Sequence, residues 1–254
     1  MIISIANQKG GVGKTTTALN LGTALAMQGK SVLLIDLDPQ ANLSKYAGFE
    51  NNDNLPTMSD ILMGQVGMRS KVEIKKCIRT DKENLVDYIP SDINLANADL
   101  YLAGVLSRET LLKRILNDNT IKSYDYTIID CNPSLGVLLM NALTASNGVL
   151  IPVQTQDFAF DGLNTLNGII EQIQSTINPK LEIMGVLATM TDNTKVSKRI
   201  IEQLKEAYGD KLYSTVIHRA TQAAESSKKH KSLCLFSNSK LGDEYKALAN
   251  EVIR

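Results

Sequence analysis

A stretch near the start of the chain has the residue types needed to bind phosphate: Gln8-Lys9-Gly10-Gly11-Val12-Gly13-Lys14-Thr15-Thr16. Its glycines let the main chain approach an anion closely and adopt a positive φ where a turn requires it. Lys14 would bind the β- and γ-phosphates of a nucleotide, and the Thr15 hydroxyl would be a ligand of Mg²⁺. Thr16 could touch phosphate or be an ordinary first-turn residue. We therefore expect a phosphate site made of Gly10, Gly11, Val12, Gly13, Lys14, Thr15 and Thr16.

The loop departs from the common phosphate-loop pattern G-x-x-x-x-G-K-[ST] in one informative way. Gln8 stands where the first glycine belongs, and a second lysine, Lys9, follows it. The common pattern indicates only that a protein binds a nucleotide, whereas this variant indicates a narrower class of nucleotide-binding protein.

The residues around the loop predict the strand and the helix that such a loop requires. An apolar run at 2–6 precedes it, and a helical pattern at 19–26 follows it and ends before Gly29. A helix that begins at the loop directs free N–H groups and the positive end of its dipole toward an anion.

Apolar runs typical of buried strands alternate with helical patterns along the rest of the chain. Such an alternation indicates a mainly parallel, twisted α/β sheet with helices on both faces. We see no linker and no repeat, and expect one domain over 1–254. The expected strands are 2–6, 32–35, 85–89, 126–129, 149–153, 183–189 and 212–217, and the clearest further helices are 162–176, 197–208 and 240–253.

Three aspartates stand where apolar runs stop, which in a parallel sheet is the edge where ligands bind. Asp130 would hold Mg²⁺ through water, and Asp38 would orient or activate the attacking water. Both could instead cap a turn, since Asp38 before Pro39 is good turn chemistry. For Asp36 we expect either a metal-related role or a purely structural one.

Composition narrows the class of protein. The chain has 254 residues, 43% of them hydrophobic, which fits a globular domain with a well-buried core. With 27 basic and 27 acidic residues the formal net charge is zero, so any DNA contact must come from a local patch. No signal peptide and no apolar run of about 18 residues is visible, so we expect no membrane span.

The cysteines exclude some metal chemistry. Cys77, Cys131 and Cys234 are widely separated and form no C-x-x-C pair. This spacing argues against a zinc site or a disulfide framework and fits a reducing cytoplasm. An iron–sulfur site that bridges two subunits is an alternative that we do not favour.

Three motifs occur together: Lys9 to Thr16, then Leu34-Ile35-Asp36-Leu37-Asp38-Pro39-Gln40, then Ile128-Ile129-Asp130-Cys131-Asn132-Pro133-Ser134-Leu135. In this combination the chain resembles the ParA family of DNA-partitioning ATPases, within the deviant Walker A or ParA/MinD group of P-loop NTPases. The segments 152–154, 215–219 and 224–226 extend the resemblance over nearly the whole chain. It corresponds to the short form of the family, without an N-terminal helix-turn-helix.

The resemblance implies ATP and Mg²⁺ as cofactors and hydrolysis to ADP and phosphate, slow without partner and DNA. In relatives ATP drives a sandwich homodimer, in which the lysine matching Lys9 reaches the partner subunit's phosphates. A second cation there would stabilise the charge that develops in hydrolysis. Asp38 matches the aspartate needed for hydrolysis. The ATP-bound dimer binds double-stranded DNA without sequence preference, and a ParB-type centromere-binding protein stimulates its release, which implies a nucleoid-associated cytoplasmic protein.

Two residues depart from the family pattern. Asn132 replaces the first of two prolines beside the γ-phosphate, which puts the hydrolysis rate in doubt. His218 stands where relatives often have proline, near the expected adenine pocket formed by Ile217, His218 and Arg219. Its imidazole could contact the base or fill space, and we favour the second.

A basic cluster near the C-terminus is the expected DNA surface. From 195 to 231 there are nine basic residues against four acidic ones. Such a cluster can grip phosphates without reading sequence, although it could also be a solvated face. The expected DNA contacts are Lys195, Lys198, Arg199, Lys228, Lys229 and Lys231.

Other functions are compatible with the same nucleotide-binding motifs. A MinD-like membrane ATPase would need a basic, strongly apolar amphipathic tail, and the stretch 241–254 carries three acidic residues instead. The sequence does not distinguish a DNA-partitioning ATPase from a related ATPase that positions a non-DNA cargo on the nucleoid. A non-hydrolysing adaptor or repressor is a further alternative, which the expected lack of a helix-turn-helix weakens.

Overall fold

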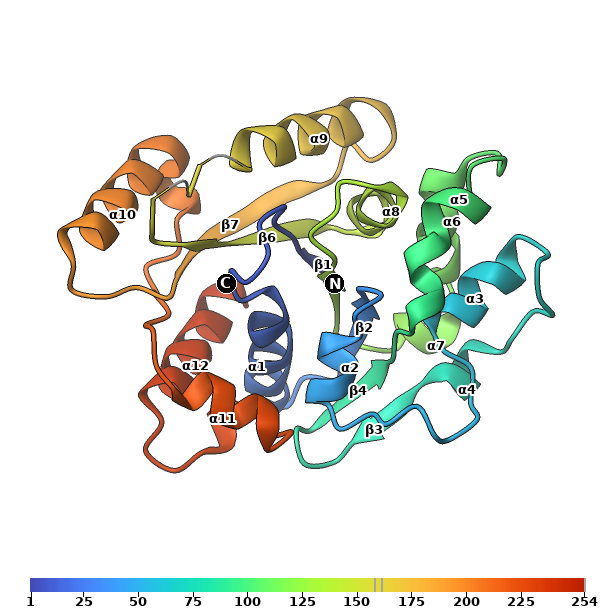
Figure 1. The fold of residues 1–254 in the computed structure, drawn as a ribbon, viewed down its shortest axis with the longest axis horizontal. Coiled ribbons are helices and arrows are strands. Elements are labelled where there is room, and N and C mark those ends of the chain that lie inside the picture. Colours follow the sequence, from blue (N-terminus) through green and yellow to red (C-terminus); the bar gives the residue numbers. More distant parts are fainter. Residues whose placement is uncertain (158, 161, 254) are drawn as a thin grey trace.

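The computed structural model describes residues 1–157, 159–160 and 162–253 (Figure 1). Seven strands form one sheet in the order β3-β4-β2-β5-β1-β6-β7. Neighbouring strands are parallel except for the pair β3 and β4. The predicted mainly parallel α/β sheet is therefore confirmed. The strands are β1 (Ile2–Ile5), β2 (Val32–Leu37), β3 (Arg79–Asp81), β4 (Val86–Ile89), β5 (Tyr126–Cys131), β6 (Gly148–Gln154) and β7 (Glu182–Thr189).

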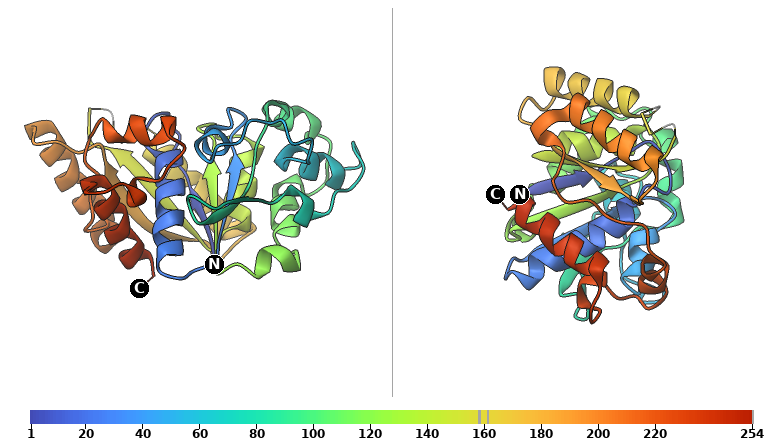
Figure 2. Two further views of the ribbon diagram at one scale, coloured as in Figure 1. Left: turned by 90° about the horizontal axis from the view of Figure 1, so that it is seen from below. Right: turned by 90° about the vertical axis from the view of Figure 1, so that its left-hand side faces the viewer.

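Helices cover both faces of the sheet (Figures 1 and 2). The α-helices are α1 (Lys14–Met27), α2 (Asn42–Tyr46), α3 (Met58–Gln65), α4 (Ile74–Cys77), α5 (Ala98–Tyr101), α6 (Leu111–Ile115), α7 (Asn119–Lys122), α8 (Val137–Ala145), α9 (Leu163–Thr176), α10 (Lys195–Tyr208), α11 (Gln222–Lys228) and α12 (Lys240–Val252). Short 3₁₀ turns are η1 (Ile93–Asn97), η2 (Arg108–Thr110), η3 (Gly209–Lys211) and η4 (Leu233–Leu235).

The central strands are buried on both sides, which explains their continuous apolar runs. In β2, Leu33 and Ile35 belong to one hydrophobic core, whereas Val32 and Leu34 belong to the other. The first core includes side chains of α3, α6, α8 and α9, and the second those of α1 and α12. A strand whose successive side chains enter two cores cannot show a polar alternation.

Helix α1 packs closely against the sheet. A Cβ added at Gly22 would lie 2.8 Å from a methyl group of Leu34 on β2, so a larger residue would force the Leu34 side chain or the helix to shift. The helix ends at Met27, and Gly29 follows with a φ of +78°, as the glycine stop signal predicts. The buried contact fixes α1, and with it the loop from which the helix starts.

The helical predictions are confirmed with small shifts in their bounds. Helices α9 and α12 match the expected segments to within one residue at each end. Helix α10 begins at Lys195 instead of 197, because the Thr194 side chain accepts a hydrogen bond from the N–H of Ser197 and so caps the first turn. That 1–254 forms a single domain stays a prediction.

The predicted strand at 212–217 is wrong. The segment runs beside β7, and two of its N–H groups donate to carbonyl oxygens of β7 at 3.0 and 2.9 Å, but only isolated bridges form. On its outer side the partners are side chains of α12. Glu251 accepts from two N–H groups at 2.9 and 2.8 Å, and Glu244 accepts from that of His218 at 2.9 Å. Carboxylates therefore satisfy the backbone where a neighbouring strand would otherwise be needed.

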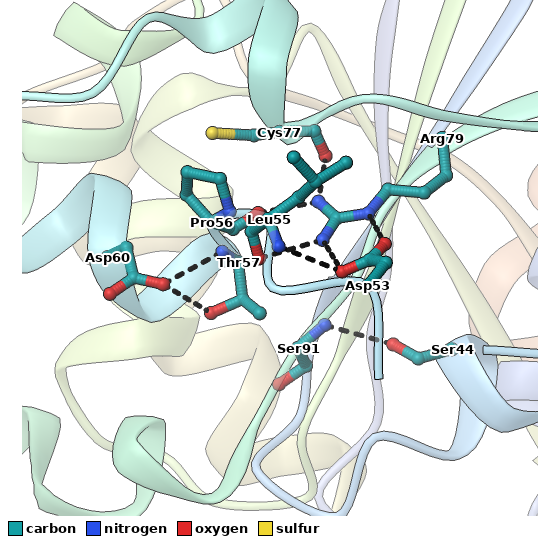
Figure 3. Close-up of polar contacts among 9 residues, drawn as sticks. All are labelled: Ser44, Asp53, Leu55, Pro56, Thr57, Asp60, Cys77, Arg79 and Ser91. Atoms are coloured by element: carbon teal, nitrogen blue, oxygen red, sulfur yellow. Dashed lines mark hydrogen bonds and ion pairs between the residues drawn. The ribbon is translucent and has the colours of Figure 1, made fainter. Parts of the chain in front are cut away.

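Strand β3 has no counterpart among the predicted strands, because it contains no apolar run. Arg79 holds this edge strand in place (Figure 3). Its guanidinium donates to both carboxylate oxygens of Asp53 at 2.9 and 3.0 Å and to the carbonyl oxygens of Leu55 and Cys77 at 2.9 and 2.7 Å. A bidentate pair between Arg79, whose side chain is 9% exposed, and Asp53, whose side chain is 31% exposed, thus anchors the strand in place of hydrophobic residues.

Candidate nucleotide site

Residues from three neighbouring strands meet at one edge of the sheet. In the parallel register Asp36 of β2 lies opposite Asp130 of β5, and Asp130 lies opposite Ile5 of β1, from which the glycine-rich loop continues. A cavity of about 660 Å³ opens there. It is lined by Gly10, Gly11, Gly13, Lys14, Thr15, Thr16, Asp38, Pro39, Gln40, Asn42, Lys45, Tyr46, Asn132, Pro133, Ser134, Met190 and Ser227.

The loop has the backbone that its glycines predict. Gly11 and Gly13 have φ values of +73° and +89°, which L-residues with a Cβ rarely adopt. No side chain caps the start of α1 at Gly13, so its first N–H groups are available to an anion. Val12 is buried, and its carbonyl oxygen accepts a hydrogen bond from Thr189 at 2.9 Å. Val12 can thus contribute its main chain to the site but not its side chain.

The two lysines of the loop are placed differently. Lys14 is buried and lines the cavity, and its Nζ donates to the main-chain oxygen of Lys9 at 3.1 Å. Burial lowers the pKa of Lys14, and the nearby Asp130 opposes that shift. Lys9 is half-buried and is not among the residues that line the cavity of its own chain.

The residues expected to hold Mg²⁺ lie together. Thr15 donates from Oγ1 to Oδ2 of Asp130 at 2.7 Å, while Oδ1 of Asp130 is buried without a partner among the described residues. Oδ1 of Asn132 is likewise buried and unpaired within that part of the chain. Burial, reinforced by the charge of Asp36, raises the pKa of Asp130 well above its usual range. Two orphaned oxygens beside a threonine hydroxyl fit a hydrated divalent cation.

This arrangement fits Mg²⁺ that is bound mostly through water and phosphate. The described residues contain no group of three or more His, Cys, Asp or Glu suited to hold a metal. Magnesium typically keeps several waters and takes one or two protein ligands together with substrate phosphates. Cys77, Cys131 and Cys234 are all buried and free, so none is exposed for a cluster shared between subunits.

Asp38 lines the cavity on a loop held from two sides. Its Oδ1 accepts from the N–H of Gln40 at 2.9 Å, which is good turn chemistry. Its main-chain oxygen accepts from Oγ of Ser91 at 2.6 Å. Sequence reasoning missed Ser91, although this residue follows the carboxyl end of β4 and could have been found by the same rule as the aspartates.

Asp36 does not line the cavity, but its carboxylate accepts hydrogen bonds that hold the loop carrying Asp38. Its Oδ1 accepts from the N–H of Asp38 at 3.1 Å, and its Oδ2 accepts from the N–H and Oγ of Ser44 at 2.8 and 2.6 Å. Ser44 in turn accepts from the N–H of Ser91 at 2.9 Å (Figure 3). Burial raises the pKa of Asp36 to about 6, and the bonds from Ser44 oppose that shift. Of the two expected roles these contacts favour the structural one, and a metal role stays a prediction.

A second cavity of about 160 Å³ adjoins the first, and Gly13, Thr16 and Met190 line both. The residues expected beside the adenine are brought together here. The further lining residues are Thr189, Ile217, His218, Arg219, Ala220, Ala223, Leu241 and Tyr245. Sequence reasoning did not find Leu241 and Tyr245 of α12, or Asn42, Lys45 and Tyr46 of α2 in the larger cavity.

The expected DNA contacts lie in two separate places. Lys195, Lys198 and Arg199 are exposed on α10, whereas Lys228, Lys229 and Lys231 lie at and after the end of α11, well apart from α10 in Figure 1. Three of the six form ion pairs: Arg199 with Asp157, Lys229 with Glu225, and Lys231 with Glu83. One chain thus does not present the basic cluster as a single patch.

Comparison with known proteins identifies the family. A protein-family profile described as an AAA domain matches residues 1–183. The chain is 45% identical over 253 residues to the sporulation initiation inhibitor protein Soj of Bacillus subtilis, and the match covers 99% of this chain and 97% of that protein. The chain belongs to the ParA family of partitioning ATPases.

One further relative and one solved structure are also similar to this ParA-family chain. It is 40% identical over 255 residues to the chromosome partitioning protein ParA of Caulobacter vibrioides, covering 99% of this chain and 93% of that protein. The structure of cobyrinic acid a,c-diamide synthase from Mycobacterium smegmatis, with bound ATP analogue and magnesium, has a TM-score of 0.85 and 31% identity. That alignment covers 100% of this chain and 94% of the other. The resemblance read from the motifs is therefore confirmed.

Proposed function

We propose that this ParA-family protein partitions a plasmid or a chromosome region through a cycle of ATP-driven dimerisation, DNA binding and hydrolysis. The observation that carries the proposal is the placement of Lys9. It belongs to the phosphate loop, yet it does not line its own chain's nucleotide cavity. Within the described residues its ammonium group forms no ion pair. A cation on the phosphate loop that does not line the cavity of its own chain suits the phosphates of a second subunit.

The contacts support a role for each residue of the site. Lys14 and the first N–H groups of α1 would bind the β- and γ-phosphates, and Thr15 and Asp130 would hold Mg²⁺, Asp130 through water. The bound ion would neutralise phosphate charge as the terminal P–O bond breaks. Asp38 orients the attacking water, since its Oδ1 bond to Gln40 leaves Oδ2 for this purpose.

DNA binding by the dimer would follow from combining the basic sites on α10 and α11 of its two subunits. One chain presents two small basic sites, and neither carries many unpaired cations. Two subunits bring four such sites onto one particle, which multiplies weak phosphate contacts. This supports a DNA affinity that depends on ATP, and a nucleoid-associated location. A ParB-type partner would then stimulate hydrolysis and release the DNA.

Positioning of a non-DNA cargo on the nucleoid remains the second candidate, because it would use the same ATP-dependent DNA binding. The MinD-like alternative is less supported. The apolar face of α12 is packed into the core through Leu241, Tyr245 and Leu248, so it is not free to lie on lipid. Among the residues that the structure describes, no helix combines the length and apolar character needed to cross a bilayer.

The proposal is tested by measuring nucleotide binding, mass and DNA retention together. With ATP and Mg²⁺ the wild-type chain should double its mass in light scattering and retard DNA duplexes of unrelated sequence. Lys14→Ala should lose ATP binding, whereas Lys9→Ala should bind ATP but remain monomeric and release DNA. Lys30→Ala, which removes the same charge beyond the far end of α1, is the control and should behave as wild type. A mobility shift that ignores ATP and is unchanged in both loop variants would contradict the proposal.

A further inference from the structure

We propose that His218 selects adenine over guanine, through a ring nitrogen that Glu244 holds ready as a hydrogen-bond acceptor. The inference deepens the proposed function, because it rests on the smaller cavity being the base site of the same nucleotide. It concerns a residue at which this chain departs from the family pattern.

Glu244 on α12 holds His218 at two points. Its Oε2 accepts the main-chain N–H of His218 at 2.9 Å, and its Oε1 lies 2.7 Å from Nδ1 of the ring. The Glu244 side chain is 12% exposed and that of His218 39%, so the contact is partly shielded from water. Lys240 also approaches Oε1 of Glu244, at 4.0 Å. The two bonds fix both the backbone and the ring.

The bond to Glu244 determines which ring nitrogen carries the proton. A carboxylate oxygen accepts hydrogen bonds, so the proton of the neutral ring lies on Nδ1. In that tautomer Nε2 has a free lone pair and can only accept. The main-chain N–H of His218 is committed to Glu244, and that of Arg219 donates to the carbonyl oxygen of Thr191 at 3.0 Å. The N–H groups of His218 and Arg219 are therefore not free to donate to a base.

The smaller cavity is the place where the base would lie. It begins at Gly13 and Thr16, at the start of α1 where the phosphates bind, and extends to His218. Ile217, Leu241 and Tyr245 give it apolar walls, which suit the faces of a flat ring. A few polar atoms in such a cavity usually decide specificity.

Adenine and guanine differ at the position that an acceptor can read. Adenine carries an amino group at N6, which donates, whereas guanine carries a carbonyl oxygen at O6, which accepts. Nε2 of His218 would pair with the first and would face the second acceptor to acceptor. A proline at this position would offer neither ring nitrogen nor N–H. Since the ring is partly exposed, we expect about a tenfold preference for ATP, the effect of one hydrogen bond.

Calorimetric titration with ATP and with GTP, each with Mg²⁺, tests the inference without relying on turnover. The wild-type chain should bind ATP about tenfold more tightly than GTP. His218→Phe keeps a flat ring without the acceptor and should bring the two affinities within about twofold of each other. His218→Gln, whose amide can turn its oxygen or its NH₂ toward the base, should do the same. Lys240→Ala, which leaves the Glu244–His218 bond intact, should keep the wild-type ratio.

The outcomes separate this inference from the ATP cycle. Equal binding of ATP and GTP by the wild-type chain, a preference for GTP, or an unchanged ratio in both His218 variants would overturn the role of His218 while leaving the ATPase intact. If the wild-type chain bound neither nucleotide, the proposed ATP cycle would fall with it.

Discussion

Lys14 donates a hydrogen bond from Nζ to the main-chain oxygen of Lys9 over 3.1 Å. The bond holds the side chain of Lys14 against the main chain of Lys9. Lys14 lines the cavity, where a phosphate would be a better acceptor for its ammonium group than a neutral carbonyl. In the proposed dimer, Lys14 serves the nucleotide of its own subunit and Lys9 serves the nucleotide of the other subunit.

Ser91 is expected to act as a positioning residue for Asp38, because its hydroxyl holds the Asp38 carbonyl and its N–H holds Ser44. Ser91→Ala should lower kcat about tenfold, with little change in KM or in ATP-driven dimerisation, since a small misplacement costs the reacting geometry more than binding. Steady-state hydrolysis and light scattering measure both quantities.

Ser59→Ala is the matched control for Ser91→Ala. Ser59 is also fully buried and also loses a short hydroxyl bond, to Asp92 at 2.6 Å, but it does not touch Asp38. It should affect stability rather than kcat, and Ser91→Thr should recover most of the lost rate. An equal fall of kcat in the Ser59 and Ser91 variants would reduce Ser91 to a general packing role.

Asp36 makes stability depend on pH. Its pKa is about 6 in the folded chain, against 3.8 for an ordinary aspartate, so between these values the folded state binds more protons than the unfolded state. The free energy of unfolding must therefore fall as pH rises from about 4 to about 6, by on the order of 2–3 kcal/mol from this group. Above that range the contribution is lost.

Urea denaturation at several pH values, with wild type and Asp36→Asn, tests this effect. The variant is less stable overall, because it loses acceptors for Ser44, but its curve against pH should be flatter between pH 4 and 6. Because the charge of Asp36 also raises the pKa of Asp130, the difference between the two curves reports both carboxyl groups. Parallel curves would show that Asp36 titrates normally in the fold.

The slope of the logarithm of the DNA-binding constant against the logarithm of salt concentration tests which of the two basic sites contacts phosphates. Each phosphate contact contributes about 0.9 to that slope, so a double variant that removes two contacts per subunit should flatten it by several units in a dimer. We compare Lys195→Ala/Lys198→Ala on α10 with Lys228→Ala/Lys229→Ala on α11. The charge-matched control, Lys113→Ala/Arg114→Ala, changes exposed residues of α6. If all three double variants gave one slope, neither basic site would bind DNA.

Much of this site could be predicted because its chemistry is local in sequence. The glycine-rich loop, Asp38 and Asp130 each follow an apolar strand, and a parallel sheet brings such positions to one edge. The contacts that could not be predicted join distant segments of the chain. Ser44 and Ser91 are 47 positions apart, and His218 and Glu244 are 26 apart, so no local pattern announces either bond.

The fold was least predictable at the edges of the sheet. At β3 an ion pair of Arg79 replaces the apolar run by which a strand is usually found. At 212–217 an apolar run is present, but Glu251 accepts from two N–H groups of this segment, Glu244 accepts from that of His218 just after it, and no regular strand forms. Periodicity reports burial, and burial determines strand pairing only where a neighbouring strand is available.

The most direct test of the central claim is a mixing experiment with Lys9→Ala and Asp38→Ala, each of which should hydrolyse almost no ATP alone. In a mixed dimer the Lys9→Ala subunit keeps Lys14 and Asp38 and receives Lys9 from its partner, so one complete site forms. If Lys9 acts across the dimer, the mixture should hydrolyse ATP several-fold faster than the sum of the two separate rates, because each mixed dimer has one complete site. If the mixture stays at the sum of the two separate rates, Lys9 does not serve the partner's nucleotide.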